Sequence, residues 1–235
     1  MLYVLSIFLK FAHLITQQLN IVMINRDLIR LKVVQIVYAY YQNGGKNLDT
    51  AEKKLFFSLN KAYDLYNYLL LLMVEVTKYA EKRIIAGKNK LRPTPEELNP
   101  NMKFIENRFT AQLECNEQLR AFVENQKKTW SNDEEFVKSL FEDIQASDYY
   151  KDYMADPYRS YESDRELWRK LYKNFVFNNP KLDALLEEQS LYWNDDKEIV
   201  DTFVLKTIKR FDVKLGAKQP LLPEYKDEED QEFAR

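Results

Sequence analysis

The chain has 235 residues, of which 46% are hydrophobic, 31% charged and 14% aromatic, and its formal net charge is −2. This is the composition of a globular protein, because an integral membrane protein carries fewer charged residues and a disordered chain carries fewer apolar ones. With so small a net charge, any nucleic-acid site must be a local patch of positive charge.

The counts of cysteine, histidine and glycine also exclude most of the common catalytic and metal sites. The single cysteine, Cys115, excludes an intramolecular disulfide, as expected in the reducing cytoplasm, and the single histidine, His13, excludes the usual histidine-rich sites. Four glycines do not assemble a phosphate-binding loop. Acidic pairs such as Glu142–Asp143 diverge by about 100° on a helix, so we interpret them as solvent-facing charges. We therefore predict no enzymatic activity, no cofactor and no metal.

Residues 1–22 begin with an apolar stretch, MLYVLSIFLKFAHLI, that Lys10 and His13 interrupt. The stretch is short for a membrane span, and it has neither a basic segment before it nor a small-residue cleavage site after it. Because Met23 follows directly, our preferred interpretation is an upstream extension from a start assigned too early. A weak membrane anchor and an extra helix packed on the domain are the alternatives, and we predict no stable membrane insertion.

The first helix is predicted from Met23 to about Gln42, because apolar residues recur there at helical spacing. Its apolar positions cover one main face and parts of the others: Ile29, Val33, Ile36, Val37 and Tyr40, and then Leu28, Leu31 and Tyr38. We therefore expect this helix to be surrounded by other elements. The segment NGGK then ends it, with Gly44 or Gly45 in the left-handed conformation that closes many helices.

A long second helix is predicted to start at Asp49 as the N-cap, with Glu52 completing a capping box. Its apolar pattern continues without a breaker to Gly87, which corresponds to a length of about 55 Å at 1.5 Å per residue. The central YNYLLLLMV is too short and too closely flanked by charges for a membrane span, so we expect it to form core.

The rest of the chain is predicted to be helical too, and we find no alternating strand pattern. Pro93, Pro95 and Pro100 predict a loop after the second helix. Further helices are expected from about Lys103 to Gln126, from Ser131 or Asn132 towards Asp156–Pro157, from a capping box of Ser163 and Glu166, from Asn179–Pro180, and over KEIVDTFVLKTIKRF before Gly216. The acidic EYKDEEDQEFAR is interpreted as a solvated tail or the first turn of another helix. The predicted fold is an all-α multi-helix bundle.

Arg26 and Arg30 are the most informative polar residues of the first helix. They are four residues apart, so they share one helical face at the edge of the apolar stripe. A guanidinium group suits phosphate because it donates two parallel, charge-assisted hydrogen bonds, and the amides of a helix N-terminus add positive potential. Pairing with acids on neighbouring helices is the alternative, and local salt bridges are commoner than ligand sites.

The run R-x-x-I-R-x-x-V-V-Q-I-V-Y from Arg26 to Tyr38 resembles the first helix of NusB, a bacterial transcription antitermination factor with an all-helical fold. Arg30 matches the arginine of the family's AR-x-x-A-V-Q-A-L-Y segment, Val34–Gln35 match its V-Q, and Tyr38 matches its tyrosine. The helix with YDLYNYLLLLMVEV is similar to that of longer bacterial forms, which carry a helical insertion. The resemblance implies NusB-like N-terminal helices followed by a helical extension.

In this family the arginine-rich start of the first helix binds single-stranded boxA RNA of ribosomal RNA leaders. It does so with a small-subunit ribosomal protein that doubles as the transcription factor NusE. The resemblance implies that Arg26 and Arg30 contact RNA within an RNA polymerase antitermination complex in the cytoplasm. Lys32 and Lys46 join the candidate RNA-binding site from their charge and position alone. Gln35 and Tyr38 are interpreted as interior, structural positions.

Motifs typical of the second half of NusB, V-x-x-N-E-A-x-x-L-A-K and F-V-N-G-x-L, are not found in this chain. We therefore expect a leader at 1–22, NusB-like helices at 23–90 and a helical extension or insertion at 91–235, in a truncated chain that lacks the C-terminal bundle. Two other functions stay open. One is a helical protein-interaction scaffold without RNA binding, which the net charge of −2 and the acidic tail favour. The other is a module of an RNA-modifying enzyme, such as a ribosomal RNA methyltransferase, without its catalytic part.

Overall fold

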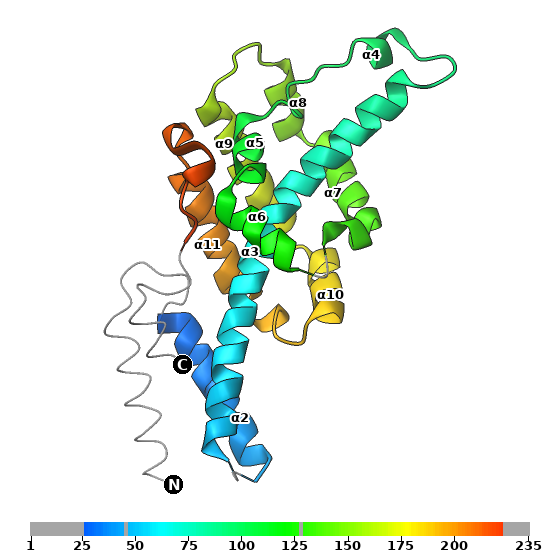
Figure 1. The fold of residues 1–235 in the computed structure, drawn as a ribbon. Helices are drawn as coiled ribbons and strands as arrows, with labels where there is room; N and C mark the ends of the chain where they lie inside the picture. Colours follow the sequence, from blue (N-terminus) through cyan, green and yellow to red (C-terminus); the bar gives the residue numbers. More distant parts are fainter. Residues whose placement is uncertain (1–25, 45–46, 127–128, 223–235) are drawn as a thin grey trace. The chain divides into compact units, whose positions relative to one another are not determined.

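The computed structural model of the protein describes residues 26–44, 47–126 and 129–222, with the side chains of Arg26 and Asp27 left undescribed. Over these residues every regular element is helical, which confirms the all-α prediction (Figure 1). The predictions for residues 1–22 and for the acidic segment after Pro223 lie outside the described residues.

The described elements are one long helix and a series of short and medium helices. The α-helices are α2 (Arg26–Gln42), α3 (Leu48–Lys88), α4 (Pro95–Leu98), α5 (Arg108–Glu114), α6 (Glu117–Asn125), α7 (Glu134–Ala146), α8 (Asp148–Ala155), α9 (Tyr161–Leu171), α10 (Pro180–Gln189) and α11 (Lys197–Arg210). The remaining helical turns are η1 (Trp130–Asp133), η2 (Tyr172–Val176), η3 (Asn194–Asp196) and η4 (Val213–Lys218).

Backbone contacts divide the chain into two compact units. Among the described residues, unit 1 contains 26–44, 47–66, 187–203 and 221–222, and unit 2 contains 67–126, 129–186 and 204–220. The helices α3, α10 and α11 each contribute residues to both units. Neither unit is therefore one continuous stretch of sequence, and the predicted boundaries at residues 22 and 90 stay predictions.

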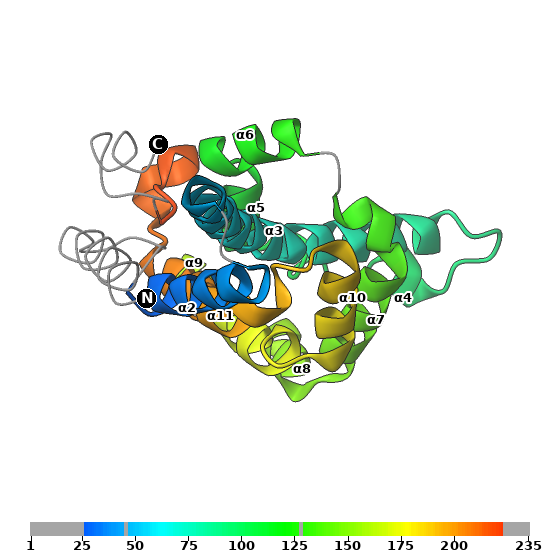
Figure 2. The same ribbon diagram turned by 90° about the horizontal axis from the view of Figure 1, so that it is seen from below.

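In unit 1, α2 lies beside the first half of α3 (Figures 1 and 2). Its inner face buries Leu28 and Ile29 completely. The expectation that α2 would be surrounded is wrong, because Val34 and Tyr38 expose 67% and 66% of their surface. Apolar residue types around the helix predict contacts on every side, but the face that carries Val34 and Tyr38 is exposed.

The boundary between α2 and α3 follows ordinary capping rules. Gly44 has a φ of 79° and donates its N–H to the carbonyl of Tyr41 at 3.1 Å, which confirms the predicted left-handed end of α2. The predicted N-cap of α3 is displaced, because Asn47 accepts the N–H of Thr50 at 3.1 Å. Asp49 lies instead in the first turn, where its charge favours the positive end of the helix dipole.

Unit 2 is built on the second half of α3, whose residues 67–77 are mostly buried. Its buried side chains include Leu69, Leu70, Leu72, Met73, Val74 and Val76. The YNYLLLLMV segment is therefore core, as predicted. No helix among the described residues combines the length and the low polarity that a bilayer crossing requires. Aromatic residues extend this core: the ring of Phe104 lies 5.8 Å from that of Phe141 and 5.7 Å from that of Trp168.

Asparagine and serine side chains divide the predicted helices of unit 2 more often than expected. The helix predicted from Lys103 to Gln126 is two helices, α5 and α6, because the side-chain carbonyls of Asn107 and Asn116 each accept N–H groups of the following turn. Ser160 is the N-cap of α9 and accepts the N–H of Ser163, so the predicted cap at Ser163 is wrong. Ser147 likewise separates α7 from α8. These side chains are short enough to bond the backbone of a first turn.

Other predicted boundaries are confirmed. Asn179 accepts the N–H groups of Lys181 and Leu182 at 3.0 and 3.2 Å, with Pro180 as the first residue of α10. The final predicted helix is α11, and Gly216, with a φ of 51°, follows it in η4. The proline-rich loop holds one short helix, α4, with a capping box.

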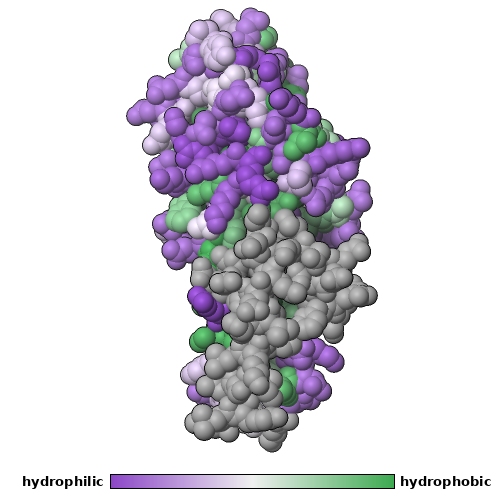
Figure 3. Space-filling view, turned by 90° about the vertical axis from the view of Figure 1, so that its left-hand side faces the viewer, coloured by the Kyte–Doolittle hydropathy of each residue, from purple (hydrophilic) through white to green (hydrophobic). Residues whose placement is uncertain are grey.

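The described part of the face in Figure 3 is mostly hydrophilic, and its hydrophobic patches are smaller. Large apolar side chains that are exposed elsewhere on the described chain are mostly isolated, such as Leu91 and Leu191. Single exposed apolar residues are common on soluble proteins. The exposed residues of α2 differ because they are neighbours on one helix.

Candidate nucleic-acid interface

The outer face of α2 carries one basic, one aliphatic and two aromatic side chains in a row. Arg30, Val34 and Tyr38 follow at intervals of four residues, so they lie within about 80° of one another around the helix axis. Arg30 is exposed, Val34 and Tyr38 are exposed at 67% and 66%, and Tyr41, at 44%, continues the row. We call these four residues the α2 stripe.

The structure corrects one expectation about this face. Tyr38 had been interpreted as an interior residue, whereas two thirds of its surface is exposed. Gln35 lies at the flank of the helix, and its amide donates to Asp195 Oδ2 at 2.8 Å. Gln35 therefore has a structural contact, as expected, but Tyr38 belongs to the outer surface.

Two of the four predicted RNA-binding residues, Arg26 and Lys46, have side chains outside the described part of the chain. Arg26 is the first residue of α2, one turn before Arg30, and its side chain is not described. Its backbone position puts it on the same helical face as Arg30. Lys46 lies outside the described residues. Of the predicted set, the structure thus places Arg30 at the surface, and it leaves the side chains of Arg26 and Lys46 as predictions.

Lys32 is the correction within this set. Only 2% of its surface is exposed, and its ammonium nitrogen lies 2.7 Å from Asp196 Oδ1, which is completely buried. The same nitrogen lies 5.9 Å from the centre of the Tyr192 ring. Lys32 follows Arg30 by about 200° around the helix, so it points to the interior of unit 1. A buried ammonium engaged with a carboxylate does not face an RNA phosphate, and Lys32 leaves the candidate interface.

The Lys32–Asp196 pair is an ion pair with imperfect geometry. Although the nitrogen and oxygen are close, neither oxygen of Asp196 accepts a regular hydrogen bond from the described groups. Burial raises the pKa of Asp196 to about 6, against the opposing effect of Lys32, and the neighbouring charge of Asp195 raises it further. Removal from water therefore outweighs the attraction of the ammonium. Together with the Gln35–Asp195 bond, the pair fastens the inner side of α2 to η3.

A groove of about 170 Å³ borders α2 on another side, between its second half and the start of α3. Its lining includes Ile36 and Tyr40 from α2, Asn43 from the turn that follows, and the exposed Lys54 from α3. Ile36 lies about 200° around the helix from Val34, so this groove is separate from the α2 stripe. Lys54 was not predicted as a site residue, because an exposed lysine in a helix is ordinarily a solvated charge.

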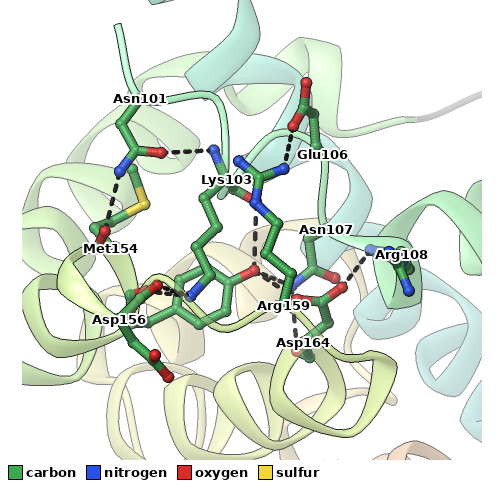
Figure 4. A network of polar contacts seen from close by, with 10 residues as sticks. Asn101, Lys103, Glu106, Asn107, Arg108, Met154, Asp156, Arg159 and Asp164 are labelled. Atoms are coloured by element: carbon green, nitrogen blue, oxygen red, sulfur yellow. Dashed lines mark hydrogen bonds and ion pairs between the residues drawn. The ribbon is translucent and has the colours of Figure 1, made fainter.

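A second polar cluster, in unit 2, is structural (Figure 4). Tyr153 donates its hydroxyl to Asp164 Oδ1 at 2.7 Å, and burial together with this bond raises the pKa of Tyr153 above its usual value. Lys103 donates from its ammonium to the carbonyls of Tyr153 and Asp156, each at 2.7 Å. Because these side chains are buried and bonded to one another, they hold the segment before α5 against α8 and α9.

Sequence reasoning missed this cluster, because Lys103 and Asp164 are 61 positions apart and look like two surface charges. Both contact Tyr153, and nothing in their local patterns predicts that they meet at this tyrosine. Among the residues described, no group of three or more metal-ligating side chains is close enough to hold a metal ion.

Comparison with known proteins gives no relative. No family model, no curated protein and no solved structure matches this chain. The resemblance to NusB therefore stays a prediction from the sequence of the first two helices.

Proposed function

We propose that this chain is an RNA-binding transcription antitermination factor of the NusB type, which binds single-stranded, boxA-like RNA at the outer face of α2. The observation that carries the proposal is the α2 stripe, where an exposed arginine and an exposed tyrosine lie two helical turns apart. Single-stranded RNA offers phosphates to guanidinium groups and unstacked bases to aromatic rings. The exposed Arg30 suits the phosphates of this ligand, and the exposed Tyr38 on the same helical face suits its bases.

The proposed contacts differ from those expected from the sequence. Arg26 and Arg30 bind phosphates, and Tyr38 stacks on a base, while Lys46 stays a predicted contact. Lys32 does not contact the RNA. Its buried pair with Asp196 stabilises the position of α2. The NusE-type ribosomal protein and the RNA polymerase antitermination complex are proposed partners on the resemblance alone.

Fluorescence anisotropy with a labelled, single-stranded boxA-like RNA tests the proposal, with a scrambled strand and a duplex for comparison. The double variant R26A/R30A should weaken binding at least about tenfold and lower the slope of log K against log salt by roughly 1.4, at about 0.7 per phosphate contact. The variant K170A/K173A removes the same charge from exposed positions of unit 2 and should leave binding unchanged. The proposal fails if R26A/R30A binds the RNA like the wild type at both low and high salt.

Tyr38→Ala separates stacking from charge. We expect a loss of about 1–3 kcal/mol in RNA affinity, the usual contribution of one base stacked on an aromatic ring, with the salt slope unchanged. An equal fall in salt slope would mean that the variant had moved the arginines.

A helical interaction scaffold is the second candidate, and the exposed aliphatic side chain of Val34 between Arg30 and Tyr38 favours it. A protein partner would bury this apolar surface, whereas contacts to RNA phosphates and bases would gain little from it. Val34→Ser distinguishes the two, because it should weaken a protein complex by about 1 kcal/mol or more and leave RNA affinity nearly unchanged.

A further inference from the structure

Unit 2 contains a cavity of about 420 Å³ that is separate from α2 and open to solvent. Its lining residues come from the end of α3, from α4, from the loop after α4, from α7 and from the start of α8. Its lining combines apolar side chains with charged ones, and the residues used below are Arg83, Lys90, Glu97, Phe104, Phe141 and Tyr150. A cavity of this size falls in the range of small-molecule sites.

The floor of the cavity is aromatic and rigid. Phe104 and Phe141 are 1% and 3% exposed, and their ring centres lie 5.8 Å apart. The ring of Tyr150 lies 5.2 Å from Phe104 and 6.2 Å from Phe141, at 88° to the latter. Each ring is held by the other two, so the floor offers a preformed apolar surface with the edge and face contacts that aromatic rings favour.

The wall of the cavity carries a guanidinium whose partners are both neutral. Arg83 donates from Nη1 to Gln145 Oε1 at 3.3 Å, and its guanidinium carbon lies 5.6 Å from the centre of the Phe141 ring. Both contacts orient the flat guanidinium, and neither neutralises its charge. The positive charge of Arg83 acts on the floor of the cavity: burial raises the pKa of Tyr150, and Arg83 opposes this rise.

The other charges around the cavity differ from Arg83. Lys90 is paired with Glu97, which also caps α4 through the N–H of Thr94. Glu96 is exposed and adds one negative charge to the rim. One uncompensated cation next to an acidic rim suits a ligand group with a single negative charge, whereas a doubly charged phosphate would lack a second cation.

We infer that this cavity binds an aromatic carboxylate, whose ring lies on Phe104, Phe141 and Tyr150 and whose carboxylate accepts hydrogen bonds from Arg83. A carboxylate matches the planar fork of a guanidinium, which can donate two parallel bonds to it. The same chemistry exists in a free aryl-alkyl acid and in the C-terminal phenylalanine of a peptide. The site shares no residue with the α2 stripe, so it does not depend on the proposed RNA function.

NMR titration of the full chain with 3-phenylpropionate tests this inference, with the neutral 3-phenylpropionamide as the matched ligand control. We expect saturable shifts of the amide signals of residues 83–87, 104–105 and 141–150 below about 10 mM acid, an affinity in the usual range of small fragments. The amide should bind at least tenfold more weakly. Absence of saturable shifts at these residues, or equal binding of acid and amide, would overturn the inference.

Three variants locate the anchor. Arg83→Gln removes the guanidinium, and Gln145→Glu gives it an internal carboxylate, so each should weaken binding of the acid at least tenfold. Lys82→Gln is the matched control, because Lys82 is the adjacent cation of α3, is 69% exposed and lies near Glu134 instead of the cavity. All three positions are exposed, and the thermal midpoint of each variant verifies folding. Unchanged affinity in folded Arg83→Gln would refute the role of Arg83.

Two peptides distinguish the sources of the carboxylate. A short peptide that ends in phenylalanine is compared with the same peptide carrying a C-terminal amide. If the free peptide binds more tightly than 3-phenylpropionate, the natural ligand is a chain end, and if it binds more weakly, the ligand is a small molecule. Both results support the shared chemistry, whereas equal binding of the free and amidated peptides contradicts it.

Discussion

The buried pair of Lys32 and Asp196 makes different predictions for single and double substitutions. Lys32→Met leaves a buried carboxylate without its ammonium and should destabilise the protein at pH 7, by less than the about 3–5 kcal/mol usual for a broken buried pair because the carboxylate can take up a proton. Asp196→Asn also leaves one partner alone, but it removes the carboxylate charge whose burial costs more than Lys32 returns, so at pH 7 it should not lower the free energy of unfolding. The double variant Lys32→Met with Asp196→Asn removes both charges, so its free energy of unfolding should return close to that of the wild type.

The pH dependence of stability follows from the raised pKa of Asp196. Its pKa is about 6 in the folded protein and 3.8 in the unfolded reference, so the folded state binds a proton more tightly. This group therefore contributes stability that is complete below about pH 4 and is lost as the pH rises through about 6. A pKa difference of about 2 between the folded and unfolded states corresponds to roughly 3 kcal/mol of stability. Asp196→Asn should remove this part of the pH dependence.

Urea unfolding between pH 4 and 7 measures these effects. The fluorescence of Trp193 reports on the right region, because its indole N–H donates to the carbonyl of Lys61 at 2.9 Å within unit 1. The variant Lys32→Met should lose more stability at pH 7 than at pH 4.5. Equal losses at both pH values, or a double variant as unstable as Lys32→Met alone, would show that the two groups do not act as a buried ion pair.

Three further predictions concern single positions. Gly87→Ala should stabilise the end of α3 by about 0.4–1 kcal/mol in urea unfolding, because the added methyl group would meet Glu97 Cγ at an ordinary 3.5 Å, and a loss of stability would mean that the site is tighter than described. Tyr153→Phe removes the buried bond to Asp164 and should cost about 1–3 kcal/mol, so an unchanged thermal midpoint would contradict the network of Figure 4. Tyr38→Ala should change the free energy of unfolding by less than about 0.5 kcal/mol, since its side chain is exposed, and a larger loss would assign it a packing role.

Helix positions could be predicted from the sequence to a large extent, because an apolar repeat every three to four residues states which face is buried. The boundaries were harder. Several side chains near each boundary can cap a helix, and tertiary contacts decide among them. Asn116, for example, caps α6 and also donates to the carbonyl of Gln219 at 2.7 Å, more than 100 residues along the chain. A local pattern contains no information on such a contact.

The candidate site shows the same limit. Arginines spaced by four residues predicted one shared face, and the structure places Arg30 at the surface. The burial of Lys32 depends on an acid far away in the sequence, as does the bond of Gln35 to Asp195 over 160 positions. The exposure of Tyr38 could not be predicted, because a tyrosine in an apolar stretch can face either the core or solvent.

The two sides of α2 should evolve under different rules. Lys32 and Gln35 are bonded to Asp196 and Asp195, so a replacement on either side of these pairs leaves a buried or bonded partner alone. We expect homologous sequences to change these positions together, lysine to an apolar residue with aspartate to an apolar one. Arg30 and Tyr38 should instead vary independently of η3 and follow the ligand, so covariation would separate the part of α2 that maintains the fold from the part that recognises another molecule.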